Sequence, residues 1–361
     1  MSKPISILLC LLMMSCLVTQ SRIEVRAETA MDELEQAILA DPENPQLLFQ
    51  RARLHLEKKA YPRAVMDFDH ALRLHPRFVE ALALRGEAYL RMGNPERSRQ
   101  DFAQVLNLAP EHETARFGLA DSLLRSGDLN RALEEFNQLL RTNPEHVQAR
   151  LKRGQLFSSR ENHAQAVTDF DIVLAKSPGM AEALLGRGKS LRELGRLENS
   201  LADLNQAVLL DSTALALMER GLTFGRLGDL DSALRDFNTA LNISPRNPEI
   251  LLHRAVLYAL AADHRRAVVD FTQVLREQPN NVHALLGKGL AHQELEQFSQ
   301  ALDDYSQVLR LDPTSYSALN NRGMIRLQLG QLSSGCTDLQ AACDFGFCTT
   351  LNFARKEGYC P

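Results

Sequence analysis

One residue type recurs along this chain at a constant step, and that step constrains the fold more than any other feature. The recurring residue is proline, and the step is 34 residues. The series consists of Pro42, Pro76, Pro110, Pro144 and Pro178, and it resumes with Pro245, Pro279 and Pro313. A fixed period of this length is typical of a chain built from stacked structural repeats.

Two small residues and one bulky apolar residue keep fixed places within each period. The first small residue, ten positions after the proline, is Ala52, Gly86, Ala120, Gly154, Gly188, Ala255, Gly289 or Gly323. The second, twelve positions later, is Ala64, Ser98, Ala132, Ala166, Ser200, Ala267, Ala301 or Gly335. The bulky residue, four positions further on, is Phe68, Phe102, Phe136, Phe170, Leu204, Phe271, Tyr305 or Leu339. This spacing predicts two helices that approach closely at the small residues, with the bulky side chain filling the space beside them.

Proline and glycine mark the expected helix ends. Proline closes the second helix of each period, because it lacks a backbone N–H and its ring clashes with the preceding turn. A glycine with left-handed backbone is expected between the two helices, at Gly93, Gly127, Gly195, Gly228 and Gly330. The sixth period keeps the order with Gly221, Ala233 and Phe237, but Asp211 or Ser212 stands where proline is expected. One residue is therefore missing between Ala207 and Gly221.

These positions together resemble the tetratricopeptide repeat (TPR) family over nearly the whole chain. We count nine repeats, at 45–78, 79–112, 113–146, 147–180, 181–213, 214–247, 248–281, 282–315 and 316–349. A half-repeat at 28–44 precedes them, and a cap at 350–361 follows. The resemblance implies an all-α, right-handed superhelical solenoid of antiparallel helix pairs. It also implies one quasi-linear unit whose ligands bind on a concave face lined by the first helices.

Charged residues repeat in the same register. A basic residue precedes the first small residue in eight repeats: Arg51, Arg85, Arg153, Arg187, Arg220, Arg254, Lys288 and Arg322. An acidic residue precedes the bulky residue in all nine: Asp67, Asp101, Glu135, Asp169, Asp203, Asp236, Asp270, Asp304 and Asp338. Repeat three alone has Leu119 in place of the base and Glu135 in place of Asp. We interpret the two rows as structural ion pairs within a repeat, with pairing to the next repeat left open; an anion-binding stripe is the alternative.

Apolar residues at expected groove positions predict where a partner binds. Three positions before the first small residue, and one position after it, are taken to face the concave side. The predicted contact residues are Phe117, Leu151, Leu185, Met218, Leu252, Leu286, Val256 and Leu290. Repeats six to eight are the most apolar, so we expect an extended or helical partner segment with apolar anchors to bind there; packing against neighbouring helices is the alternative.

Composition and motifs argue against several other functions. The formal net charge is −4 and the basic residues are scattered, which disfavours nucleic-acid binding. Gly186–Ser190 resembles the end of a phosphate-binding loop, but it lies within a predicted helix and lacks the leading glycine. No histidine spacing indicates a metal site. We therefore expect a non-catalytic protein with no cofactor, no metal and no small-molecule substrate, whose partner is a protein or peptide.

The first residues have the pattern of an export signal. Lys3 precedes an apolar run that continues to Val18, too short to span a bilayer comfortably. Val25-Arg26-Ala27 offers a cleavage site, so residues 1–27 are predicted to be a signal peptide and the protein periplasmic or secreted. One alternative is a lipoprotein anchored in the membrane through Cys16, although Met13 and Met14 depart from the usual lipidation motif. The other is an uncleaved membrane anchor.

Four cysteines gather at the C-terminal end of a chain predicted to be exported, which indicates disulfides. Cys336 and Cys343 are about 10.5 Å apart along one helix, beyond bridging distance. Two connectivities remain, and we favour the nested one, Cys336–Cys360 and Cys343–Cys348, over the other and over a zinc site. It requires a last helix over 349–357 that runs back along 331–343 and seals the end of the solenoid.

The predicted function is that of a binding scaffold in the bacterial cell envelope, aiding assembly or secretion of another complex. The alternatives are a substrate-recruiting or regulatory subunit of an enzyme complex that acts in trans, and a protein of the eukaryotic secretory pathway.

Overall fold

The structure is a computed structural model that describes residues 31–361, and every regular element in this range is a helix. Residues 31–40 are the described part of the first helix. The predicted signal peptide 1–27, Cys16 and the first three residues of the half-repeat 28–44 lie outside the described residues. Within residues 31–361, no helix combines the length and the apolar character that crossing a membrane requires.

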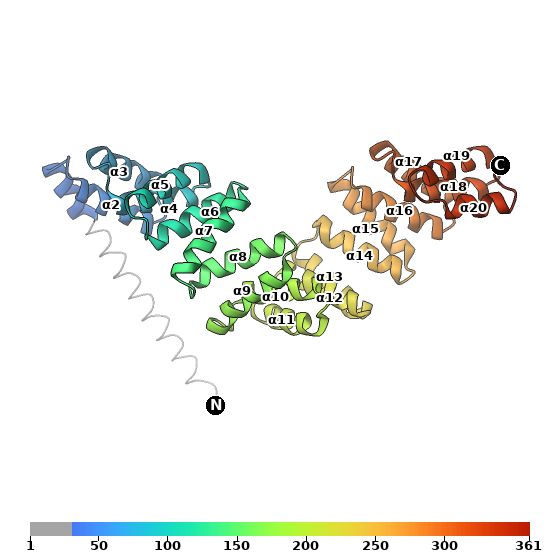
Figure 1. Cartoon of the computed structure of the whole chain (residues 1–361), viewed down its shortest axis with the longest axis horizontal. Coiled ribbons are helices and arrows are strands. Elements are labelled where there is room, and N and C mark those ends of the chain that lie inside the picture. Colours follow the sequence, from blue (N-terminus) through green and yellow to red (C-terminus); the bar gives the residue numbers. More distant parts are fainter. Residues whose placement is uncertain (1–30) are drawn as a thin grey trace, which may run out of the picture. The chain divides into compact units, whose positions relative to one another are not determined.

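Two kinds of helix alternate along the chain (Figure 1). The first helices are α2 (Pro45–Glu57), α4 (Val79–Arg91), α6 (Glu113–Arg125), α8 (Val147–Ser159), α10 (Ala181–Glu193), α12 (Ala214–Leu227), α14 (Pro248–Leu260), α16 (Val282–Glu294) and α18 (Tyr316–Gln328). The second helices are α3 (Tyr61–Leu74), α5 (Pro95–Leu108), α7 (Leu129–Thr142), α9 (His163–Lys176), α11 (Leu197–Leu210), α13 (Leu230–Ile243), α15 (His264–Glu277), α17 (Phe298–Leu311) and α19 (Leu332–Asp344). A short helix, α20 (Thr349–Lys356), completes the chain.

The helices form two compact units that divide between Arg160 and Glu161, at the turn between α8 and α9. The sequence predicted one continuous array, because the proline and small-residue spacing runs through this point without interruption. In the first unit, α2 packs against α3, α4 against α5 and α6 against α7, and each pair also contacts the next. In the second unit the same arrangement joins α10 to α19, with α9 packed against α10.

The core of each unit is built from the small and bulky residues that the spacing singles out. Phe68, Phe136, Phe237, Phe271 and Tyr305 are fully buried, each on a second helix. The partner position on the first helix has little room for a side chain, since a Cβ on Gly289 would lie 2.8 Å from Cε1 of Tyr305. The all-α fold of packed helix pairs is therefore confirmed, and its cause is the close approach at small residues.

The turn inside each pair requires left-handed backbone, as the sequence predicted. Gly93, Gly127, Gly195, Gly228 and Gly330 all have positive φ. The equivalent residues of the remaining pairs are Lys59, Glu161, Ala262 and Glu296, and they too have positive φ, between 56° and 62°. Tertiary packing therefore imposes this turn even where no glycine relieves the strain.

The missing residue lies in the turn between α11 and α12. α11 ends at Leu210 and α12 begins at Ala214, so residues 211–213 connect them. Thr213 caps α12 by accepting a hydrogen bond from the Ala216 N–H at 3.1 Å. A side-chain cap here begins the next helix without the proline turn used elsewhere.

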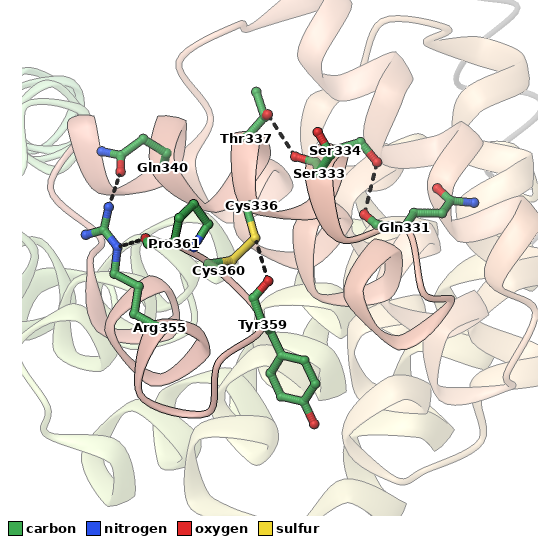
Figure 2. Close-up of a disulfide and its surroundings, with 10 residues drawn as sticks. All are labelled: Gln331, Ser333, Ser334, Cys336, Thr337, Gln340, Arg355, Tyr359, Cys360 and Pro361. Atoms are coloured by element: carbon green, nitrogen blue, oxygen red, sulfur yellow. Dashed lines mark hydrogen bonds between the residues drawn. A yellow bond between two sulfur atoms is a disulfide. The ribbon is translucent and has the colours of Figure 1, made fainter.

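The C-terminal helix α20 packs against α19 at the end of the second unit, and Figure 2 shows the disulfide and the contacts of Arg355 that hold this end. Disulfides join Cys336 to Cys360 and Cys343 to Cys348, which is the nested connectivity favoured from the sequence. Leu339 of α19 packs in one cluster with Leu351 and Ala354 of α20. Arg355 adds polar contacts, donating to the Pro361 carbonyl at 2.8 Å and to Gln340 Oε1 at 3.0 Å.

Candidate partner-binding groove

The two rows of repeated charges, which we call the charge ladder, link the two helices of seven pairs. In seven pairs the base on the first helix lies between 2.6 and 2.9 Å from the acid on the second. These pairs are Arg51–Asp67, Arg85–Asp101, Arg187–Asp203, Arg220–Asp236, Arg254–Asp270, Lys288–Asp304 and Arg322–Asp338. Arg254 donates from Nε and Nη2 to both oxygens of Asp270, and the hydrogen bond and charge of Asp270 raise the pKa of Arg254 against the effect of its burial. The prediction of ion pairs within a repeat is confirmed.

The remaining guanidinium nitrogen reaches the preceding pair. Nη1 of Arg85 donates to Asp69 at 2.7 Å, Nη1 of Arg187 to Asp171 at 2.6 Å and Nη1 of Arg254 to Asn238 at 2.7 Å. Each of these arginines therefore ties its own second helix to the second helix before it. Because their donors are taken up inside the array, these arginines are not a free anion-binding stripe.

The first helices of the second unit form a continuous face, because each of α10, α12, α14, α16 and α18 contacts the next. One apolar residue of four successive helices occupies the same register on this face: Leu222, Val256, Leu290 and Met324. We call these four residues the apolar stripe. Leu222 is half-buried, whereas Val256, Leu290 and Met324 are 43%, 40% and 41% exposed. A row of exposed apolar side chains on one face is a feature of interaction surfaces.

The other predicted contact residues are less accessible than the sequence suggested. Leu151 and Met218 are only 1% and 3% exposed, so they are core residues and cannot contact a partner. Phe117 stacks on His146, and Leu252 and Leu286 pack against buried clusters.

Leu185 is half-buried as well. The low exposure of these predicted contact residues is explained by the rotation of each helix about its axis. Residues three before and one after the small residue are four apart, which turns them about 40° relative to each other at 3.6 residues per turn. The earlier position consequently faces the neighbouring helices, and the later one faces solvent.

A hollow of about 400 Å³ opens on the same face between α10, α12 and α14. Its apolar wall consists of Leu222, Val256, Leu257 and Leu260, and Gly225 lies in its lining. Gly225 holds the position at which four other repeats carry Leu56, Leu90, Leu124 and Leu327. Only Leu257, at 3.5 Å, approaches a Cβ built on Gly225, so the space of the absent side chain is open.

A buried ion pair lies beside the hollow. Arg192 of α10 donates from Nη1 to Glu219 of α12, at 2.6 Å to the carboxylate and 3.0 Å to the backbone carbonyl. Both side chains are almost fully buried, and Lys189 adds a third charge at 3.6 Å from Glu219. Arg192 also stands where other repeats have leucine. This site was not predicted from the sequence. Its sequence signal is that Arg192 and Gly225 stand at a position where four repeats carry leucine, although Ser158, Ala259 and Gln293 depart from leucine there too.

The charges at the edge of the hollow are paired too. Arg226 lies 2.7 Å from Glu193 and donates to the Arg192 carbonyl at 2.9 Å. Burial opposes ionisation of Glu193, but the hydrogen bond from Arg226 and the charges of both arginines outweigh it and lower the pKa of Glu193.

His253 contributes an aromatic surface to the wall. Its ring stacks on Phe237 with centroids 6.3 Å apart. Burial lowers the pKa of His253 below its ordinary value, although Glu249 and Glu219 oppose that effect. In residues 31–361, no group of three or more His, Cys, Asp or Glu side chains is placed to hold a metal ion. The arrangement therefore offers shape, apolar surface and paired charge.

These features define a helical-repeat protein in which the first helices of the second unit present one shared face. The sequence matches the tetratricopeptide repeat family at residues 26–77, 62–113, 83–146, 117–166, 151–216, 218–281 and 286–344, so the chain belongs to that family. The repeat fold is that of a protein-interaction scaffold, and the matching family is not a catalytic one. No curated protein matches the sequence.

Solved structures with the same fold include a tetratricopeptide repeat protein from Parabacteroides merdae, which is 18% identical with a TM-score of 0.54 over 68% of this chain and 98% of that one. PilW, a type IV pilus biogenesis factor, is 21% identical with a TM-score of 0.53 over 57% and 96%. The Cut9–Hcn1 complex is 15% identical with a TM-score of 0.54 over 88% and 79%. At these identities the likeness is one of fold.

Proposed function

We propose that this protein is a non-catalytic interaction scaffold of the cell envelope, which binds a segment of a partner protein along the first helices of its second unit. The observation that carries the proposal is the apolar stripe. It places one apolar residue on each of four neighbouring helices, at a register where the first unit has the polar or charged residues Arg53, Glu87, Asp121 and Gln155. At this register an apolar partner segment therefore matches the face of the second unit and not that of the first.

The proposed envelope location rests on the two disulfides. Two disulfides within the last 26 residues fit an oxidising compartment, because cytosolic thiols are kept reduced. The proposed organisation is a signal peptide at 1–27, a half-repeat at 28–44, nine repeats at 45–349 and a disulfide-linked cap at 350–361. Mass analysis of the N-terminus of protein purified from the producing cell tests it. A chain beginning at Glu28 supports cleavage, one beginning at lipidated Cys16 supports the membrane-anchored form, and an unprocessed Met1 contradicts a cleaved signal peptide.

The binding function is tested with peptides selected on the purified protein from a random peptide display library. We expect the selected peptides to lose affinity at least tenfold on Leu290→Asp and on Met324→Asp, because a charge within the stripe must be desolvated when an apolar segment binds. Val269→Asp is the matched control: Val269 is 55% exposed but lies on a second helix, α15. Equal binding to all three variants and the parent protein would contradict the proposal. Leu252 and Leu286 are unsuitable for this test, since their contacts with the core would make Asp destabilising.

A further inference from the structure

The hollow lies beside Gly225, a glycine at a position where the other eight repeats carry a side chain: Leu56, Leu90, Leu124, Ser158, Arg192, Ala259, Gln293 and Leu327. Leucine occupies the equivalent position in four other repeats, and there it packs against the neighbouring helices, as Leu56, Leu90 and Leu124 do. At Gly225 nothing fills that space, while Leu222, Val256 and Leu257 still provide the apolar wall. The array thus retains a leucine-sized vacancy that opens to solvent.

The charges around the hollow do not favour a charged ligand, because they are paired with one another. Arg192 is paired with Glu219, Arg226 with Glu193, and Lys189 approaches Glu219. The lining holds three bases (Lys189, Arg192, Arg226) and three acids (Glu193, Glu219, Glu249), so the two signs balance. The surface that remains unsatisfied is apolar, and Leu260 at its mouth is largely exposed.

The size of the hollow limits what it can take. Its 400 Å³ lies near the lower end of the range for ligand pockets, about 300–1,000 Å³. That space accepts one large side chain with its adjoining backbone, and the apolar wall excludes a charged one by the cost of desolvation.

We propose that the hollow is an anchor site that receives one large apolar side chain of the partner segment, a leucine, methionine or phenylalanine, in the place that Gly225 leaves empty. The paired charges of Arg192, Glu219, Glu193 and Arg226 form the polar border around the anchor. Burial of one such side chain contributes a large share of the binding energy, as anchors at the centre of interfaces do. This inference rests on the proposed function, because it assigns a specific role to one point on the same groove face.

The hollow is tested directly with two small probes, N-acetyl-leucinamide and N-acetyl-aspartamide, added to the full protein while the methyl resonances of Val256 and Leu257 are followed by NMR. We expect concentration-dependent shifts with the leucine probe only. Gly225→Leu should abolish them by filling the hollow, with the fold retained because four repeats already carry leucine at this position. Gly225→Ala is the matched control and should retain them.

Two results overturn the anchor site: no shift with the leucine probe, or shifts that persist unchanged in Gly225→Leu. If Gly225→Leu fails to fold, Leu260→Arg replaces it, since this exposed residue at the mouth can be exchanged without disturbing the core. The arginine should weaken the leucine probe at least fivefold, and unchanged binding overturns the site.

The selected peptides separate this inference from the proposed function. Leu290 and Met324 lie on the stripe but do not line the hollow. Peptides that lose affinity on Leu290→Asp yet bind Gly225→Leu as tightly as the parent support the groove and overturn the anchor. Peptides unaffected by both stripe variants contradict the groove function, whatever the small probes show. Loss of affinity in both kinds of variant supports both.

Discussion

Arg116 donates a hydrogen bond to Glu135 at 2.9 Å, and so joins α6 to α7 from a position three residues before the usual base of the ladder. The usual position holds Leu119, the single gap in the basic row. The same guanidinium donates to the Pro110 carbonyl at 2.6 Å. An arginine almost one turn away approaches from a different direction, and the longer glutamate side chain meets it. The joint departure of Leu119 and Glu135 is therefore a relocated ion pair.

The ladder predicts that loss of a buried ion pair lowers the free energy of unfolding much more than loss of an exposed pair does. Asp270 is almost fully buried, so Asp270→Asn leaves Arg254 without its carboxylate. We expect a loss on the order of 3 kcal/mol in the free energy of unfolding, measured by urea denaturation. Glu87→Gln removes the exposed pair with Arg91, and should cost less than about 1 kcal/mol. Similar losses in the two variants would contradict a structural role for the ladder.

Two glycines on first helices predict opposite effects of the same substitution. A Cβ on Gly287 would lie 2.4 Å from Cζ of Phe271, whereas one on Gly225 meets only Leu257 at 3.5 Å. Gly287→Ala should lower the melting temperature because the fully buried Phe271 ring must move. Gly225→Ala should raise it, since alanine favours a helix over glycine by about 1 kcal/mol. Thermal melts of the two proteins check the signs, and a stabilising Gly287→Ala would be inconsistent with the packing described.

The two disulfides are expected to contribute unequally. The Cys336–Cys360 bond closes a loop with a sequence separation of 24, against 5 for Cys343–Cys348. A longer loop loses more chain entropy in the unfolded state, about 3 kcal/mol for loops near 15 residues. Replacing Cys336 and Cys360 with serine should therefore speed hydrogen exchange in α20 more than replacing Cys343 and Cys348. The reverse order of exchange rates would show that the short loop is the one that holds the cap.

The lowered pKa of His253 predicts that the free energy of unfolding decreases at acidic pH. Burial lowers the pKa of His253 in the folded protein, so the unfolded state binds the proton more readily. The contribution is complete above the unfolded pKa, near pH 6.5, and is lost as the pH falls from there toward the folded pKa. Urea unfolding at pH 7.5 and at pH 5 should show a smaller decrease for His253→Gln than for the parent protein. An equal decrease in both would assign the pH dependence to other groups, such as His55, whose pKa burial also lowers.

The sequence by itself determined the helix pair of each repeat and the disulfide-linked cap at the C-terminal end. Small residues and bulky residues at fixed spacing indicated close packing, the glycines indicated the turns, and the even group of cysteines indicated the cap. These predictions succeed because they depend on contacts between residues of one repeat or of adjacent repeats, which a constant period encodes directly.

Tertiary structure alone decided which side chains remain accessible. Leu151 and Met218 looked like groove residues, yet a rotation of about 40° buries them, while Val256 and Leu290 stay exposed. The division between α8 and α9 and the hollow beside Gly225 were equally hidden. Exposure depends on the rotation of each helix against its neighbours, which a repeat pattern does not record. The pattern does show that Gly225 lacks a side chain, but only the packed structure shows that no neighbouring side chain fills the space.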